Sequence, residues 1–188
     1  DEVAKNVGMS KFHFIRVFKE YVGVTPKQFL HCVTLNYAKE HIKESKSILD
    51  SSLDIGLSST SRLHELFVNL IGVTPKEWKE KGKDVQITYG FGETPFGEAL
   101  IGFTDKGICY LGFIDDNKNE IFNRFNELWE NANLLHDKTA ANKYLENIEE
   151  GFKISATNGN RKINLKCPDC GAIYKILPHN LVNTGKFN

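Results

Sequence analysis

Apolar residues recur with helical spacing over roughly the first 80 residues of this 188-residue chain. Two stretches place apolar side chains at positions i, i+3, i+4 and i+7, which is the spacing of one helix face. The first stretch comprises Phe14, Val17, Phe18 and Tyr21, and the second comprises Leu63, Leu66, Phe67 and Leu70. Between them the pattern predicts a long helix from Pro26 to Leu49, capped by Thr25. Its expected buried positions are Leu30, Val33, Tyr37, Ile42 and Leu49.

The period changes from helical to alternating at about residue 85. Residues 85–89 alternate like a β-strand, which Gly90, Gly92 and Pro95 are expected to interrupt. The apolar runs at 98–104 and 108–114 are joined by a turn at 105–107, which predicts a hairpin. A helix should follow, with one apolar stripe, and a second helix is expected over 140–150. The stripe contains Ile121, Phe122, Phe125, Leu128 and Trp129.

An internal repeat lies within the helical part. Val-Gly-Val-Thr-Pro-Lys at 22–27 returns as Ile-Gly-Val-Thr-Pro-Lys at 71–76, and Gly-Met-Ser at 8–10 returns as Gly-Leu-Ser at 56–58. The second copy has one additional residue between its Gly-Leu-Ser and Phe67. In the first copy a short helix at 2–7 ends at Gly8, which tolerates a positive φ, and Ser10 caps the next helix. Each copy therefore has the form of a helix-turn-helix unit.

The second helix of each copy has an open face opposite its apolar face, as a helix in a DNA major groove requires. In the first copy Arg16 is suited to a guanine edge, and Lys11 and Lys19 to phosphates. Phe12 and Ile15 are expected to meet thymine methyl groups. The residues expected to contact DNA in the second copy are Ser59, Thr60, Ser61, Arg62 and His64.

Two considerations bear on that interpretation. Glu65 lies on the same face of the second copy, and because a carboxylate repels phosphate, this helix is expected to read fewer bases. The pattern also fits a pair of purely structural helical hairpins. The duplication of the Gly, Ser, Phe and Gly-x-Thr-Pro landmarks favours DNA binding over that alternative.

The quoted residues resemble a known family. Gly-Met-Ser-x-Phe-His-Phe-x-Arg-x-Phe-Lys at 8–19, together with the repeated Gly-Val-Thr-Pro-Lys, is similar to the AraC-type DNA-binding domain. Ser-Arg-Leu-His-Glu-Leu-Phe at 61–67 resembles the Ada-type branch, whose members regulate the alkylation response. The family domain has a further helix before its first unit, and this chain begins at Asp1 inside a helical pattern. We therefore expect the chain to start within a longer protein.

Charge divides the chain into blocks, which predicts a modular protein. Residues 1–88 carry thirteen Lys or Arg and eleven Asp or Glu, residues 89–152 carry five and twelve, and residues 153–188 carry six and one. The predicted domains are a double helix-turn-helix at 1–84, an α+β domain at 85–152 and a basic tail at 153–188. No apolar run is long enough for a bilayer, and the four cysteines form no disulfide framework, so we expect a cytoplasmic protein without membrane contact.

The middle block resembles a second family. Tyr-Gly-Phe at 89–91, Thr-Pro-Phe-Gly-Glu-Ala-Leu at 94–100 and Gly-Ile-Cys-Tyr-Leu-Gly-Phe at 107–113 are similar to the N-terminal, ribonuclease-H-like domain of the alkylguanine-DNA alkyltransferases. In that family a second domain holds the acceptor thiol in a Pro-Cys-His-Arg motif, which is absent from this sequence. Cys109 lies in an apolar strand without a neighbouring His and Cys32 in an amphipathic helix, so both are interpreted as core residues.

The tail contains Cys-Pro-Asp-Cys-Gly at 167–171, which resembles half of a zinc ribbon. A structural zinc needs four ligands, and Cys167 and Cys170 supply two. Three alternatives remain open. The second pair follows beyond residue 188, the two thiols bind no metal and stay reduced, or the zinc site is completed by His179 or by another chain.

Together these observations predict a multi-domain fold, first α and then α+β, with a CxxC tail. The predicted function is sequence-specific binding of double-stranded DNA by a transcription regulator of the alkylation response, with RNA polymerase as a second expected partner and zinc as a candidate cofactor. One alternative is a fragment of a methylated-DNA–protein-cysteine methyltransferase that lacks its acceptor domain, and another is a binding scaffold whose middle domain only docks partners. The missing acceptor motif favours the regulator, so we expect no enzymatic activity from this chain.

Overall fold

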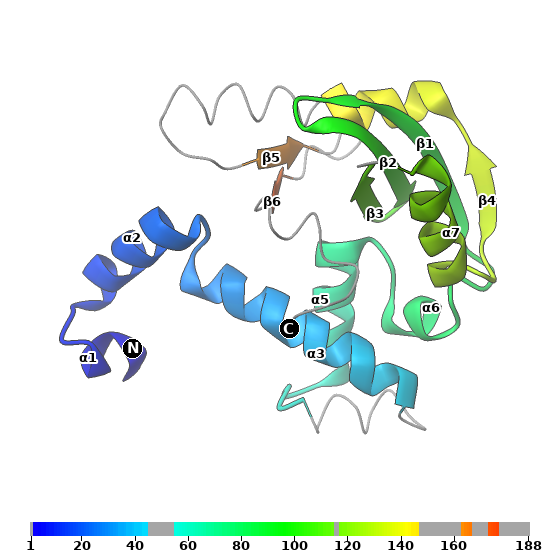
Figure 1. Cartoon of the computed structure of the whole chain (residues 1–188). Helices are drawn as coiled ribbons and strands as arrows, with labels where there is room; N and C mark the ends of the chain where they lie inside the picture. The colour runs from blue at the N-terminus through cyan, green and yellow to red at the C-terminus, as the bar shows by residue number, and fades with distance from the viewer. Residues whose placement is uncertain (1, 45–54, 115–116, 147–162, 167–172, 177–188) are drawn as a thin grey trace.

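The computed structural model describes residues 2–44, 55–114, 117–146, 163–166 and 173–176. Its helical part consists of α1 (Glu2–Asn6), α2 (Lys11–Val22), α3 (Pro26–Glu44), α5 (Thr60–Ile71) and α6 (Pro75–Lys79). Next come β1 (Gln86–Thr94), β2 (Gly97–Thr104), β3 (Gly107–Phe113), α7 (Lys118–Leu128) and β4 (Asn133–His136). A helical segment at 138–146 and the strands β5 (Ile163–Lys166) and β6 (Ile173–Ile176) complete the described part (Figure 1).

Local capping interactions account for the helix boundaries. The Ser10 hydroxyl accepts a hydrogen bond from the backbone N–H of His13, and the Thr25 hydroxyl accepts one from Gln28. Gly8 has a φ of +66°, as the predicted turn requires. The predicted caps and turn are thus confirmed. Helix α3 begins at Pro26 as predicted, while residues 45–49 of the expected helix lie outside the described residues.

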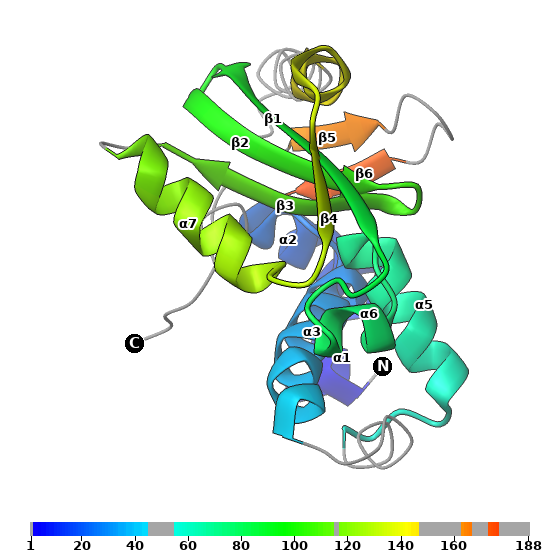
Figure 2. The same cartoon turned by 90° about the vertical axis from the view of Figure 1, so that its right-hand side faces the viewer.

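The sheet has the strand order β3-β2-β1-β4 (Figure 2). Strands β1, β2 and β3 form an antiparallel meander, which confirms the predicted hairpin. Strand β4, which the sequence pattern did not indicate, pairs in parallel with the first half of β1. The helical segment that follows begins at 138 rather than at the predicted 140, and its course beyond 146 is outside the described residues.

The expected interruption of β1 at two glycines is wrong, because the strand continues through both. A Cβ on Gly90 would lie 2.6 Å from the Cβ of Ala141, and one on Gly92 would lie 2.6 Å from a methyl carbon of Leu145. These glycines therefore let the helical segment at 138–146 approach the strand closely.

One apolar core joins the second helix-turn-helix unit to the sheet. It includes Ile42 of α3, Phe67 of α5, Trp78 of α6, Ile87 of β1 and Phe125 of α7. The indole rings of Trp78 and Trp129 meet edge to face with centroids 5.5 Å apart. The predicted stripe of α7 faces this core, with Phe125 and Trp129 fully buried. A smaller core lies between the sheet and the helical segment at 138–146 and comprises Ala99, Ile101, Ala141, Tyr144 and Leu145.

The predicted buried face of α3 is partly wrong. Leu30, Val33 and Tyr37 are exposed, whereas Leu35, Ala38 and Ile42 are buried. Apolar residues occur on two sides of this helix, and α5 and α6 cover the side that carries the second set. Tyr21, expected in the core stripe of α2, is 86% exposed, while Phe18 of the same stripe contacts Phe29 with ring centroids 5.7 Å apart. The apolar stripe of α2 is thus longer than the part of it that α1 and α3 cover.

The described part of the tail is a small antiparallel hairpin. Strands β5 and β6 pair with Ile163 opposite Ile176 and Lys166 opposite Ile173. Cys167 and Cys170 lie between these strands, in a segment outside the described residues, so zinc binding there stays a prediction. In the part of the chain that is described, no helix has the length and apolar character needed to cross a membrane.

Candidate nucleic-acid interface

Helix α2 presents a mixed cationic and apolar face to solvent. Lys11, Phe12 and Arg16 are exposed, with Phe12 at 83%, while Ile15 and Lys19 are half-buried. A guanidinium nitrogen of Arg16 lies 3.1 Å from Nδ1 of His13, which is also exposed. This face can therefore present a guanidinium group and a large apolar side chain to the major groove of DNA.

Helix α5 presents the equivalent face of the second unit. Thr60, Ser61, Arg62, His64 and Glu65 are all exposed. Beneath them Leu63, Leu66 and Phe67 are buried, and Leu70 is half-buried, which confirms the predicted division into two faces.

The N-cap of α5 is Ser59, whose hydroxyl accepts a hydrogen bond from the backbone N–H of Arg62. The additional residue of the second copy moves the cap one position beyond Ser58, the repeat equivalent of Ser10. Ser59 is half-buried, so its side chain fixes the start of the helix in addition to any contact with DNA.

His13 is a candidate that the sequence reasoning missed. It lies three residues before Arg16, the spacing at which helical side chains meet. This spacing could have identified His13 from the sequence. An imidazole one helical turn from Arg16 can accept a hydrogen bond from the guanidinium and so fix the orientation of the arginine side chain.

The two units differ in how firmly they are held. Helix α2 buries no residue completely, and its main neighbours are α1 and α3. Helix α5 buries three residues and packs against α3, α6 and strand β3. Figure 1 shows this difference, with α1 and α2 beside the start of α3 and away from the sheet, and α5 next to the sheet.

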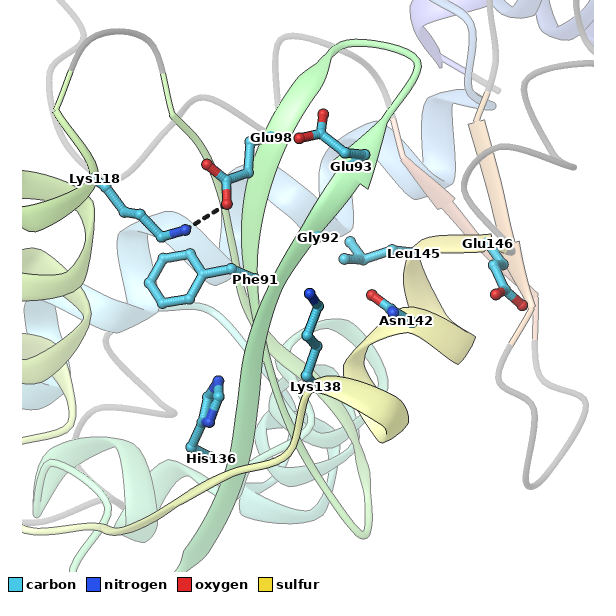
Figure 3. Close-up of a pocket in the computed structure, with 10 residues that line it drawn as sticks. All are labelled: Phe91, Gly92, Glu93, Glu98, Lys118, His136, Lys138, Asn142, Leu145 and Glu146. Atoms are coloured by element: carbon cyan, nitrogen blue, oxygen red, sulfur yellow. Dashed lines mark hydrogen bonds and ion pairs between the residues drawn. The ribbon is translucent and has the colours of Figure 1, made fainter.

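The sheet region has its own hollow, of about 640 Å³, beside the part of β1 that β4 does not cover. Figure 3 shows the ion pair between Lys118 and Glu98 on one wall, next to Phe91. The Lys118 ammonium lies 4.2 Å from the centre of the Phe91 ring. His136 and Lys138 line the wall formed by β4 and the helical segment that follows it.

Of the two cysteines in the described region, Cys109 is a core residue, as predicted, whereas Cys32 is only half-buried and belongs to neither apolar core. Cys109 is buried in β3, and burial raises the pKa of its thiol far above the ordinary value. Cys32 is half-buried in α3, where burial also raises the pKa of its thiol. A thiol with a raised pKa holds little thiolate at neutral pH and is a poor nucleophile. The described residues also contain no cluster of three or more His, Cys, Asp or Glu suited to a metal ion.

The class of this protein is defined by the capped unit of α1 and α2, the long helix α3 and a second capped helix, α5. The segment before α5 that would complete the second unit includes residues 45–54, which lie outside the described residues. Comparison with known proteins agrees, because a family model described as a helix-turn-helix domain matches residues 3–81, from α1 to the end of α6. The chain is 32% identical over 83 residues to the probable transcription factor PqrA of Proteus vulgaris, covering 44% of this chain and 68% of that protein. It belongs to the AraC-type helix-turn-helix family of transcription regulators.

Two longer proteins also match. The bifunctional transcriptional activator/DNA repair enzyme Ada of Escherichia coli is 26% identical over 117 residues, covering 62% of this chain and 33% of Ada. The HTH-type transcriptional regulator ArgR of Pseudomonas aeruginosa is 36% identical over 78 residues, covering 41% of this chain and 24% of ArgR. The chain therefore spans a third or less of the length of these two relatives. No solved structure gives a significant match.

Proposed function

We propose that this chain binds double-stranded DNA sequence-specifically through α2 and α5 and thereby regulates transcription. The observation that carries the proposal is the duplicated pattern, in which each second helix has an apolar face and an opposite exposed face. The apolar face is buried in α5 and partly buried in α2. A major groove admits one helix, so two such helices suit two segments of a binding site. In this role RNA polymerase is the proposed second partner.

We further propose that the setting is the response to DNA alkylation. The similarity to Ada extends over 117 residues, more than the 3–81 range of the family model, so it includes part of the chain outside the helix-turn-helix units. The sheet that follows α6 supports the same proposal, because the ribonuclease-H-like resemblance of 89–113 falls on β1, β2 and β3. The proposal predicts that genes next to matching DNA sites respond to an alkylating agent. Deleting the gene for this protein should abolish that response.

The DNA-binding proposal is tested by selecting duplexes from a random library with the intact chain. We expect enrichment of one sequence, with an affinity that falls as salt rises because counterions are released from the phosphates. Enrichment of no sequence, with binding no tighter than to random duplex, contradicts the proposal.

The role of Arg16 is tested on the selected duplex. Arg16→Ala should cost about 1–3 kcal/mol of binding free energy and relax the preference at one base, because a bidentate contact with guanine is lost. Arg124→Ala is the matched control, since Arg124 lies on α7 and pairs with Glu120. If Arg16→Ala leaves both affinity and base preference unchanged, α2 is not in the groove as proposed.

A further inference from the structure

The sheet contains two turns of the same four-residue form, Thr94-Pro95-Phe96-Gly97 between β1 and β2 and Thr104-Asp105-Lys106-Gly107 between β2 and β3. In each, the threonine hydroxyl accepts a hydrogen bond from the backbone N–H two residues on, at 3.1 Å in the first turn and 3.0 Å in the second. In each, the same hydroxyl also faces the carbonyl of the glycine that closes the turn, at 2.8 Å and 3.5 Å. Both threonines therefore have a local role in their own turn.

Thr104 also makes a contact outside its turn. Its side chain is buried, and its hydroxyl lies 2.5 Å from the carbonyl oxygen of Gly72, the C-cap residue of α5. A hydroxyl has one proton to donate, and this acceptor is closer than Gly107 O, so the proton goes to Gly72. The last carbonyls of a helix have no partner within the helix, and Thr104 supplies one here.

The backbones of the turn and of the helix end are in direct contact. Gly72 has a φ of +59°, and a Cβ added to it would lie 2.4 Å from the carbonyl oxygen of Gly107. Only glycine fits this position, both for its φ and for the space it leaves. A shift of the turn would therefore displace the end of α5.

A second connection holds the neighbouring helix. The Lys106 ammonium lies 3.2 Å from a carboxylate oxygen of Glu77, and the other oxygen of this carboxylate accepts a hydrogen bond from the backbone N–H of Thr74 at 2.7 Å. Glu77 and Thr74 form the capping box of α6. The turn thus contacts both ends of the short connection between α5 and α6.

We propose that the β2–β3 turn positions recognition helix α5, and that Thr104 is the positioning residue. This inference rests on the proposed DNA binding and deepens it. The turn sets the direction in which the exposed Arg62 and His64 approach the bases, so the α+β region determines specificity in the half of the DNA site that α5 reads.

The test compares two threonines on the duplex that the wild-type chain selects. Thr104→Val removes the hydroxyl that bonds to Gly72 and keeps the shape. Thr94→Val makes the same change in the β1–β2 turn, where the hydroxyl bonds to Phe96 and Gly97 of its own turn. Bases read by each helix are first assigned with Arg62→Ala and Arg16→Ala. We expect Thr104→Val to weaken binding about tenfold, as loss of a buried hydrogen bond can, and only through the bases assigned to α5.

Thr94→Val and Thr104→Ser should both bind within about twofold of the wild type, the second because serine keeps the donor. Circular dichroism at the assay temperature establishes that each variant is folded. If Thr104→Val does not fold, Lys106→Met takes its place, with Lys83→Met as a control that removes the same charge from an exposed site.

Unchanged base preference in the folded Thr104 variant, or in Lys106→Met where that variant replaces it, overturns the inference. Equal losses of DNA-binding affinity in the variant and its matched control also overturn the inference. Failure of the proposed function has a different signature, because the wild-type chain then enriches no duplex at all.

Discussion

Replacing Trp78 tests whether the second helix-turn-helix unit and the sheet form one folded unit. The Trp78 side chain is 9% exposed, and its ring contacts Phe67 of α5 with centroids 6.4 Å apart and Trp129, just after α7, at 5.5 Å. The Lys39 ammonium lies 4.7 Å from the centre of the same ring. Trp78→Ala removes contacts to both parts of the chain at once.

The expected loss follows from these contacts. Truncating a buried aromatic residue to alanine costs about 3–5 kcal/mol, and each well-oriented ring pair contributes about 0.5–1.5 kcal/mol beyond its buried area. Trp78 makes two such pairs, so we expect about 4 kcal/mol, a large part of the roughly 5–15 kcal/mol that stabilises a typical domain. Trp78→Phe keeps a ring at this position and should cost less than half as much.

The assay is urea denaturation followed by two signals. Trp78 and Trp129 are the two tryptophans of the sequence, so fluorescence reports on this core, while far-ultraviolet circular dichroism reports on the helices. In Trp78→Ala the remaining fluorescence comes from Trp129, which caps α7 and so reports on the α+β region. We expect its transition to shift together with the helical signal. Phe12→Ala, at an exposed site, should change stability by no more than about 0.5 kcal/mol.

Independent shifts of the two unfolding transitions would refute the reasoning. If Trp78→Ala shifts the helical transition and leaves the Trp129 transition within about 1 kcal/mol of the wild type, α6 and the sheet unfold independently. The shared apolar core would then contribute little to the stability of the sheet.

Three further predictions concern the ionisable and metal-binding groups. Burial lowers the pKa of Lys39 from 10.5 to about 8, so between these pH values the unfolded chain binds a proton that the folded chain has lost. The free energy of unfolding should therefore rise with pH over this window. A rise of the same size in Lys39→Met would contradict the assignment to Lys39. Because burial raises the pKa of the Cys109 thiol, mass spectrometry after incubation with alkylated duplex should show no adduct, and a stoichiometric adduct would reverse its interpretation as a core residue. Since Cys167 and Cys170 supply two of four ligands, we expect no stoichiometric zinc after dialysis against a chelator; one zinc per chain would implicate His179 or a neighbouring chain.

Features fixed by neighbouring residues could be predicted from the sequence. The cap at Ser10, the positive φ of Gly8 and the turn between β2 and β3 each depend on a few adjacent residues, and all three are present. The division of α5 into two faces was equally predictable, because its core residues keep the spacing of a helix face.

Features fixed by distant partners could not. Strand β4 has only four residues, and its parallel pairing with β1 depends on contacts between residues 47 positions apart, such as Gln86 and Asn133. On α3 the apolar pattern allowed two faces, and the choice of Leu35 over Leu30 depends on where α5 and α6 pack. Within the candidate interface, the half-burial of Ile15 and Lys19 likewise depends on tertiary packing rather than on spacing.

The two recognition helices therefore place different demands on DNA binding. Helix α2 carries more cations, with Lys11, Arg16 and Lys19, but buries no residue completely. Attraction to phosphates acts over several ångströms and tolerates an imprecise approach, whereas hydrogen bonds to base edges require fixed geometry. Helix α5 has fixed geometry before DNA arrives, because the sheet holds its C-terminal end. Part of the free energy that α2 gains from its DNA contacts is therefore offset by the cost of fixing the position of this helix. For α5 this cost is smaller, so nearly all of the free energy of its contacts contributes to affinity.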